Sequence, residues 1–306
     1  MLKRLWRILR KKQNFICPNK TNGICLKKIN GSMIPILFIA PSLIGVSIFV
    51  LIPFADVLKK SFFTSNGETF VWFHNYFTVL HNDAFRLAAS NTVKFAAICI
   101  PLLVVISLLL ALFLNTINKY RDMGKSVFLL PLAIPAASMV LIWKLFFHEN
   151  GLINGWIEGL GGGSIPFMTS NAAFWVLIGS YLWKNMGYDM ILWIGGLSSI
   201  SLDLYEAASI DGADKVQQFF FITLPNLIGV LFMIFVLSLL NSFKVFREAY
   251  LVAGEYPHTS MYMLQHLFNN WFTALDIEKL SAGAVLMALV IFTLILILKR
   301  LWGEGD

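Results

Sequence analysis

The sequence predicts an all-α, polytopic membrane protein with six transmembrane helices, and three observations carry that prediction. First, 58% of the 306 residues are hydrophobic and only 13% are charged, far from the balance of a soluble domain. Second, apolar runs of about 20 residues, long enough to cross a bilayer as a helix, recur six times. Third, backbone polar groups in hydrocarbon need internal partners, so runs of this length form helices and not the shorter strands of a barrel.

The six predicted spans are separated by segments that are richer in polar residues. They cover Ile34–Pro53, Val93–Leu114, Val127–Phe147, Ala172–Leu197, Leu227–Phe243 and Ser281–Leu298. We see no internal repeat between them. The sequence therefore predicts one transmembrane domain over residues 33–302, preceded by a basic segment over residues 1–32.

The distribution of Lys and Arg predicts the sidedness of the protein. Nine of the 24 basic residues lie before the first predicted span. By the positive-inside rule this places the N-terminus in the cytoplasm, and six spans return the C-terminus to the same side. The net charge of +7 therefore reflects topology and not a nucleic-acid partner. The basic segment either lies against membrane lipid as an interfacial helix or remains solvated.

One polar segment, Asp203 to Pro225, is much longer than a simple turn requires. Asp203 followed by Glu206 matches a capping box at a helix start, and Gly212 is expected to end that helix. A second short helix is expected to start near Asp214 and to run until Pro225 forbids its continuation. Helices this short are unstable alone in water, so we expect a hairpin held by this protein on one side and by a partner on the other.

This polar segment resembles the cytoplasmic EAA loop of the membrane subunits of binding-protein-dependent ABC importers. The matching residues are Glu206, Ala207, Ala208, Gly212, Ile222, Leu224 and Pro225. Flanking stretches such as "FLLPLAIPAASMVLIWKLFF" and "GLINGWIEGLG" are similar to the sugar-importing branch of that family. The similarity extends from about Pro35 to the C-terminus and is strongest to the first permease of maltose or glycerol-3-phosphate systems.

The resemblance implies a type I ABC importer permease fold in a bacterial plasma (inner) membrane. It implies a second homologous permease, two ABC ATPase subunits and an extracytoplasmic solute-binding protein as partners. No cofactor is expected on this chain, because ATP and Mg²⁺ are used by the ATPase subunits. The first helix of the loop would sit in a cleft of one ATPase, where Glu206 pairs with a basic residue. Asp211 would add to an acidic surface that faces a basic one.

The fourth predicted span is unusually polar at its middle, and ionisable groups inside a membrane often mark a functional path. Candidates for lining a substrate path are Trp183, Lys184, Asn185, Tyr188, Asp189 and, on the fifth span, Asn241. Trp183 offers an aromatic face on which a sugar can stack. The alternative is structural: a Lys184–Asp189 pair locks helices together, while Asn241 bonds to a neighbour.

No group of residues predicts an enzyme or a metal site. The stretch "MGKS" lacks the first glycine of a phosphate-binding loop, because Lys119 stands in its place. The five histidines are too widely spaced for a metal motif. We expect a non-catalytic permease subunit for a sugar, an oligosaccharide or a sugar derivative. The alternatives are a permease for another small solute and a stand-alone secondary carrier or channel, which would need no docking loop.

Overall fold

The computed structural model describes residues 33–64, 67, 69–117 and 121–302. Over these residues the regular structure is helical, apart from one bridge between Phe63 and Phe70. The all-α prediction is confirmed for this part of the chain. The predicted basic segment, residues 1–32, lies outside the described residues. The chain divides into two compact units, Met1–Phe54 and Ala55–Asp306.

The described part of the first unit is a continuous helical stretch. α2 (Met33–Val46) leads into a π-helical turn, η2 (Ser47–Leu51), and then into α3 (Ile52–Lys60), which crosses the boundary between the units. The stretch Phe38–Lys60 is long and apolar enough to cross a membrane, so this span continues past the predicted end at Pro53. The wider π-helical turn before Pro53 relieves the clash that a proline ring makes inside an ordinary helix.

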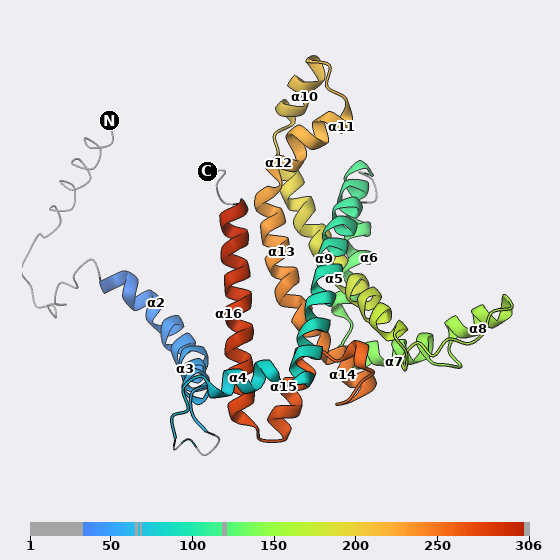
Figure 1. The fold of residues 1–306 in the computed structure, drawn as a ribbon. Helices are drawn as coiled ribbons and strands as arrows, with labels where there is room; N and C mark the ends of the chain where they lie inside the picture. Colours follow the sequence, from blue (N-terminus) through green and yellow to red (C-terminus); the bar gives the residue numbers. More distant parts are fainter. Residues whose placement is uncertain (1–32, 65–66, 68, 118–120, 303–306) are drawn as a thin grey trace, which may run out of the picture. The chain divides into compact units, whose positions relative to one another are not determined.

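The second unit contains long helices, with shorter helices grouped near their ends (Figure 1). Its elements are α4 (His74–His81), α5 (Asp83–Thr116), α6 (Arg121–Ala133), α7 (Ala136–Phe147), α8 (Leu152–Gly159), α9 (Ala172–Ser199), α10 (Leu202–Ile210), α11 (Lys215–Gln218), η4 (Phe219–Thr223), α12 (Leu224–Asn226), α13 (Ile228–Ser242), η5 (Phe243–Val245), α14 (Phe246–Ala253), η6 (Thr259–Met261), α15 (Leu264–Thr273) and α16 (Ile277–Trp302). In Figure 1, α10 and α11 project beyond the long helices at one end, while α4, α14 and α15 lie at the other.

Four helical stretches of the described chain are long and apolar enough to cross a membrane, or five if a bent pair counts as one span. The four are Phe38–Lys60, Asp83–Thr116, Ile228–Ala253 and Ile277–Arg300. The bent pair replaces the predicted third span Val127–Phe147, which is not one straight helix. It consists of residues 123–133 and 136–159, which meet at 93°. Pro135, with an extended backbone (ψ 145°), separates the two parts.

Helix α9 is the centre of packing in the second unit. It contacts α5, α6 and α13, and its buried residues join a core cluster with those of α5. Phe95 of α5 meets Tyr181 of α9 edge to face, with 5.4 Å between the ring centroids. Trp193 of α9 donates a hydrogen bond to the buried Ser107 hydroxyl of α5 at 3.0 Å. The predicted fourth span is therefore a helix with partners on several sides, although its polar middle keeps it out of the four apolar stretches.

The contact between α9 and α6 leaves no room for a side chain at Gly187. A Cβ placed on this glycine would lie 1.9 Å from the carbonyl oxygen of Phe128. The neighbouring atom belongs to the backbone of α6, which cannot move aside as the end of a flexible side chain can. The two helices therefore approach this closely only because residue 187 is glycine. By contrast, a Cβ on Gly195 of the same helix would meet nothing within 4 Å.

Replacing Gly187 with alanine is therefore expected to push α9 away from α6. We expect Gly187→Ala to lower the melting temperature of the detergent-purified protein by several degrees, as core overpacking costs about 1–3 kcal/mol. Gly195→Ala is the matched control and should leave the melting temperature unchanged or raise it, because alanine favours a helix. Equal melting temperatures for the two variants would contradict the close approach at Gly187.

His266 of α15 is fully buried and held in its neutral form. Its Nδ1 accepts a hydrogen bond from the Met263 N–H at 3.2 Å, so Nε2 carries the proton. The Nε2 atom has no hydrogen-bond partner among the described residues, and the Phe246 ring lies edge-on at 4.7 Å between centroids. Burial lowers the pKa of His266 from 6.5 to about 4. A protonated imidazole would be a charge without compensation in this place.

The depressed pKa of His266 makes the fold sensitive to acid. The unfolded chain takes up a proton at a higher pH than the folded one, so stability is full above pH 6.5 and falls as the pH is lowered toward 4. The loss approaches about 3 kcal/mol. We expect His266→Asn, which retains an acceptor for Met263, to flatten the decline of the melting temperature across this range. Exposed His74→Asn is the control, and an identical slope in both variants would argue against the buried neutral histidine.

Candidate functional site

The first candidate site is a helical hairpin, residues 201–226, whose first helix is capped by Ser201. The Ser201 side chain accepts a hydrogen bond from the N–H of Asp203 at 3.3 Å. The predicted capping box of Asp203 and Glu206 is therefore wrong. Ser201 has the extended backbone of an N-cap (ψ 136°), whereas Asp203 already lies in the first turn of α10. There its carboxylate interacts favourably with the helix dipole.

The bend of the hairpin is built on Gly212, as the sequence predicted. Gly212 has a φ of +84°, a left-handed conformation that costs glycine nothing. Its N–H bonds to the Ser209 carbonyl at 3.1 Å, and the Ala213 N–H bonds to the Ala208 carbonyl at 2.9 Å. This pair of bonds is the Schellman motif, which satisfies the last carbonyls of α10 and turns the chain sharply.

The second arm of the hairpin starts where predicted but does not end at Pro225. The Asp214 carboxylate accepts the Gln217 N–H at 2.7 Å, and Gln217 Oε1 accepts the Asp214 N–H at 2.9 Å. Beyond this capping box, α11 passes through the π-helical turn η4 into α12, with Leu224 donating its N–H to Phe219. Pro225 stands at the start of α12. As at Pro53, a π-helical turn lets the helical path continue through a proline.

Side-chain hydrogen bonds hold the two arms together. The Tyr205 hydroxyl lies 2.9 Å from Thr223 Oγ1, which joins α10 to the base of the second arm. The Gln218 amide donates to Ser209 Oγ at 2.9 Å and to the Ala213 carbonyl at 3.1 Å. The hairpin therefore has a defined shape within the single chain.

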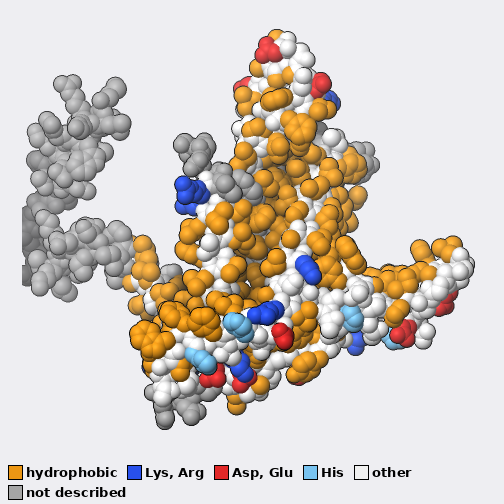
Figure 2. All heavy atoms as spheres, viewed as in Figure 1, with side chains coloured by type: hydrophobic (Ala, Val, Ile, Leu, Met, Phe, Trp, Pro, Cys, Tyr) orange, Lys and Arg blue, Asp and Glu red, His pale blue; other side chains and the backbone are white. Residues whose placement is uncertain are grey.

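The tip of the hairpin exposes both acidic and apolar side chains (Figure 2). Glu206, Ala207, Asp211 and Gly212 are exposed, as is Pro225 at its base. The remaining predicted coupling residues, Ala208, Ile222 and Leu224, are half-buried. Ile210 is 87% exposed and Val216 is 63% exposed, which is unusual for apolar residues on a short polar loop. Such a surface is typical of an interaction site.

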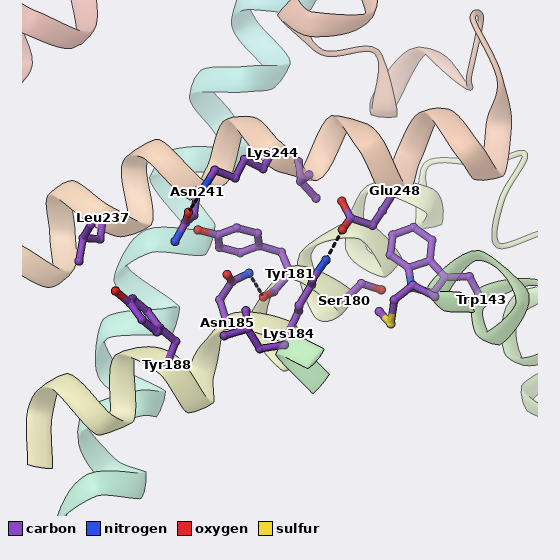
Figure 3. Close-up of a pocket in the computed structure, with 13 residues that line it drawn as sticks. Trp143, Ser180, Tyr181, Lys184, Asn185, Tyr188, Leu237, Asn241, Lys244 and Glu248 are labelled. Carbon is purple, nitrogen blue, oxygen red and sulfur yellow. Dashed lines mark hydrogen bonds and ion pairs between the residues drawn. The ribbon is translucent and has the colours of Figure 1, made fainter. Parts of the chain in front are cut away.

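The second candidate site is a cavity of about 460 Å³ in the second unit (Figure 3). One wall comes from α9, the facing wall from α13, η5 and α14, and α6 and α7 contribute the rest. The lining residues are Leu132, Met139, Trp143, Ser180, Tyr181, Lys184, Asn185, Tyr188, Leu237, Asn241, Lys244, Val245 and Glu248. Its volume lies within the range of pockets that bind small molecules.

An ion pair and hydrogen bonds organise the polar groups of the cavity. Lys184 of α9 pairs with Glu248 of α14, a contact that joins residues 64 positions apart. On the same wall as Glu248, the Lys244 ammonium donates to Asn241 Oδ1 at 2.8 Å. The Asn185 amide donates to the Tyr181 carbonyl at 2.8 Å. Because its carbonyl oxygen is not part of that bond, Asn185 retains an acceptor.

The structure brings four of the six predicted path residues together in this cavity: Lys184, Asn185, Tyr188 and Asn241. Trp183 and Asp189 are not part of its lining. Trp183 is 37% exposed, and Asp189 is buried, where its Oδ2 accepts a hydrogen bond from Ser238 Oγ at 2.8 Å. The alternative Lys184–Asp189 pair is wrong, since each residue has a different partner.

Sequence reasoning missed most of the remaining lining residues. Glu248 is the most important, because it neutralises Lys184 from another helix. Its signal was present as an acidic residue at the end of an apolar run, but a pairing across 64 positions cannot be read from local spacing. Trp143 and Tyr181 were missed because buried aromatic residues in apolar helices look the same whether they face a core or a cavity.

A comparison with known protein families matches residues 88–302, more than half of the chain. The matching family is described as "Binding-protein-dependent transport system inner membrane component". The hairpin and the cavity both lie within the matched residues.

Individual relatives and a solved structure agree with this family. The chain is 31% identical over 269 residues to a probable starch degradation products transport system permease of Thermoanaerobacterium thermosulfurigenes, covering 83% of this chain and 89% of the relative. It is 31% identical over 263 residues to a sulfoquinovosyl glycerol transport system permease of Agrobacterium fabrum, covering 83% and 85% of the two chains.

A chain in the crystal structure of a bacterial ABC transporter involved in the import of the acidic polysaccharide alginate has the same fold. It superposes with a TM-score of 0.79 at 20% identity, over 99% of both chains. This chain therefore belongs to the inner membrane components of binding-protein-dependent transport systems, as a non-catalytic, multi-pass permease subunit of an ABC importer.

Proposed function

We propose that this permease forms half of the pore of an importer for a sugar or sugar derivative, together with a second, homologous permease. Two ATPase subunits bind on the cytoplasmic side, where the hairpin and both termini lie, and an extracytoplasmic binding protein delivers the solute. The observation that carries the proposal is the hairpin: a preformed, projecting element with acidic and apolar side chains exposed at its tip.

In this proposal the chain crosses the membrane six times, with α9 as a span. Its 28 residues measure about 42 Å, enough for the bilayer core. The polar residues in the middle of α9 line the cavity. They lower the mean hydropathy of this helix, as expected for a span that borders a path for a polar solute. The bent pair α6 and α7 forms the remaining span. In it, α6 crosses part of the membrane and α7 closes one side of the cavity.

The hairpin is suited to transmit force from an ATPase. Its caps and cross-arm hydrogen bonds give it a fixed shape, so a push at the tip moves the whole element. The second arm leads, through a single turn residue at Leu227, into α13, which lines the cavity. A movement imposed on the hairpin would therefore reach Asn241 along a short path through the chain. The exposed carboxylates favour a basic cleft on the ATPase, and Ile210 supplies an apolar contact.

The cavity supports a sugar as the solute. Asn185, Asn241 and Ser180 offer donors and acceptors for hydroxyl groups, and the aromatic rings of Tyr188 and Trp143 offer apolar faces. The two named relatives belong to transport systems for starch degradation products and sulfoquinovosyl glycerol, which are both sugar compounds.

Removing the charge of Glu206 tests the docking role. We expect Glu206→Gln to reduce solute uptake by about tenfold or more and to weaken co-purification of the ATPase subunits, because charge-assisted contacts are worth about 1.5–3 kcal/mol. Glu158→Gln, an exposed acid of α8 outside both sites, is the control and should behave as wild type. A stand-alone carrier would be indifferent to both changes, and undiminished uptake in Glu206→Gln would favour that alternative.

Truncating Tyr188 tests the cavity as the substrate path. Tyr188→Ala should lower uptake about fivefold to tenfold while ATPase co-purification stays intact, because a ring that contacts the solute is worth about 1 kcal/mol or more. Trp183→Ala is the matched control on the same helix, since Trp183 does not line the cavity. If Trp183→Ala abolishes uptake and Tyr188→Ala does not, the path runs elsewhere.

A further inference from the structure

The charges that line the cavity do not balance. Its lining contains two lysines and one glutamate: Lys184, Lys244 and Glu248. Lys184 and Glu248 neutralise each other in their ion pair. Lys244 contacts the neutral amide oxygen of Asn241, and it takes part in none of the ion pairs found among the described residues. The lining therefore carries one positive charge in excess.

Lys244 is also accessible to a ligand. Its side chain is exposed, and its ammonium lies 2.8 Å from the amide oxygen of Asn241, where both residues line the cavity. A bound anion would neutralise the excess charge of the lining. The cavity is therefore electrostatically complementary to a ligand with one negative charge.

The arrangement of the walls shows where that charge would lie. In Figure 3, Lys244 and Asn241 stand on one wall, and Asn185 and Tyr188 stand on the α9 wall across from them. A sugar ring between the walls would meet hydrogen-bonding groups on both sides. An acidic substituent on the ring would be placed at the Lys244 ammonium, beside the amide of Asn241.

We propose that the cavity takes an anionic sugar derivative, whose carboxylate, sulfonate or phosphate group is bound by Lys244. This inference rests on the proposed function of the cavity as the sugar path and specifies its substrate class. Lys244 is the specificity-determining residue, whereas Lys184, already neutralised by Glu248, contributes hydrogen bonding.

Glucose and glucuronate provide a matched pair of probes, because they differ only in the group at C6, a hydroxymethyl in one and a carboxylate in the other. Binding of each labelled sugar to the purified, assembled transporter is measured by equilibrium dialysis. We expect glucuronate to bind about tenfold more tightly than glucose, as for one charge-assisted hydrogen bond. Lys244→Gln should remove this advantage, so that the ratio of the two dissociation constants falls to about one. Arg247→Gln, an exposed cation outside the lining, should retain it.

Each other outcome contradicts a defined part of the account. If glucose binds as tightly as glucuronate, the anionic class is wrong while the cavity remains a sugar site. If Lys244→Gln still binds glucuronate more tightly than glucose, Lys244 is not the residue that binds the carboxylate. If neither sugar binds in the millimolar range, the cavity is not the sugar path and both proposals fall.

A second measurement tests whether the ligand of Lys244 is a lipid phosphate. The binding of both sugars is measured in nanodiscs of phosphatidylcholine alone and in nanodiscs that also contain phosphatidylglycerol. We expect the preference for glucuronate in both; if it disappears only when phosphatidylglycerol is present, Lys244 binds the lipid phosphate and the proposal is wrong.

Discussion

The need to satisfy polar groups inside an apolar medium determines how the second unit is built. Helix α9 carries Lys184, Asp189 and Tyr181 in a segment that must lie among apolar neighbours, and each finds its partner on the stretch from α13 to α14. Lys184 pairs with Glu248, while Asp189 and Tyr181 both bond to Ser238. An unsatisfied polar group in such surroundings costs several kcal/mol, so these contacts select the pairing of the two helices. The cavity lies between the same two elements.

The hairpin and the cavity are physically connected through α13. The first arm of the hairpin is fixed by Ser201 and Gly212, and the second by Asp214. The π-helical turn η4 lets the chain pass Pro225 into α12, and a single turn residue, Leu227, separates α12 from α13. The exposed hairpin is therefore joined to a cavity wall over a short length of chain. Proline occurs two positions after a π-helical turn in α3 as well, so the chain uses the same solution twice to continue a helix through proline.

Local features were predictable from the sequence, and features that depend on distant contacts were not. Gly212 and Asp214 act through neighbours within a few positions, so their roles were visible. The choice of Ser201 over Asp203 as the cap depends on where the extended backbone becomes helical, which spacing does not reveal. The bend at Pro135 was missed because a long apolar run also fits one straight span. The Lys184–Glu248 pair and the separate burial of Asp189 depend on which helices meet, and spacing along the sequence does not reveal that.

The most direct test of the account is the location of the hairpin tip in the assembled transporter. Ala207→Cys is introduced after Cys17, Cys25 and Cys99 have been replaced with serine or alanine, and the membranes are treated with a short bifunctional thiol reagent or with an impermeant maleimide. The account predicts that residue 207 is cross-linked to a cysteine in the cleft of the ATPase and is labelled by the maleimide only from the cytoplasmic side. Labelling from the opposite side, with no cross-link to the ATPase, would contradict it.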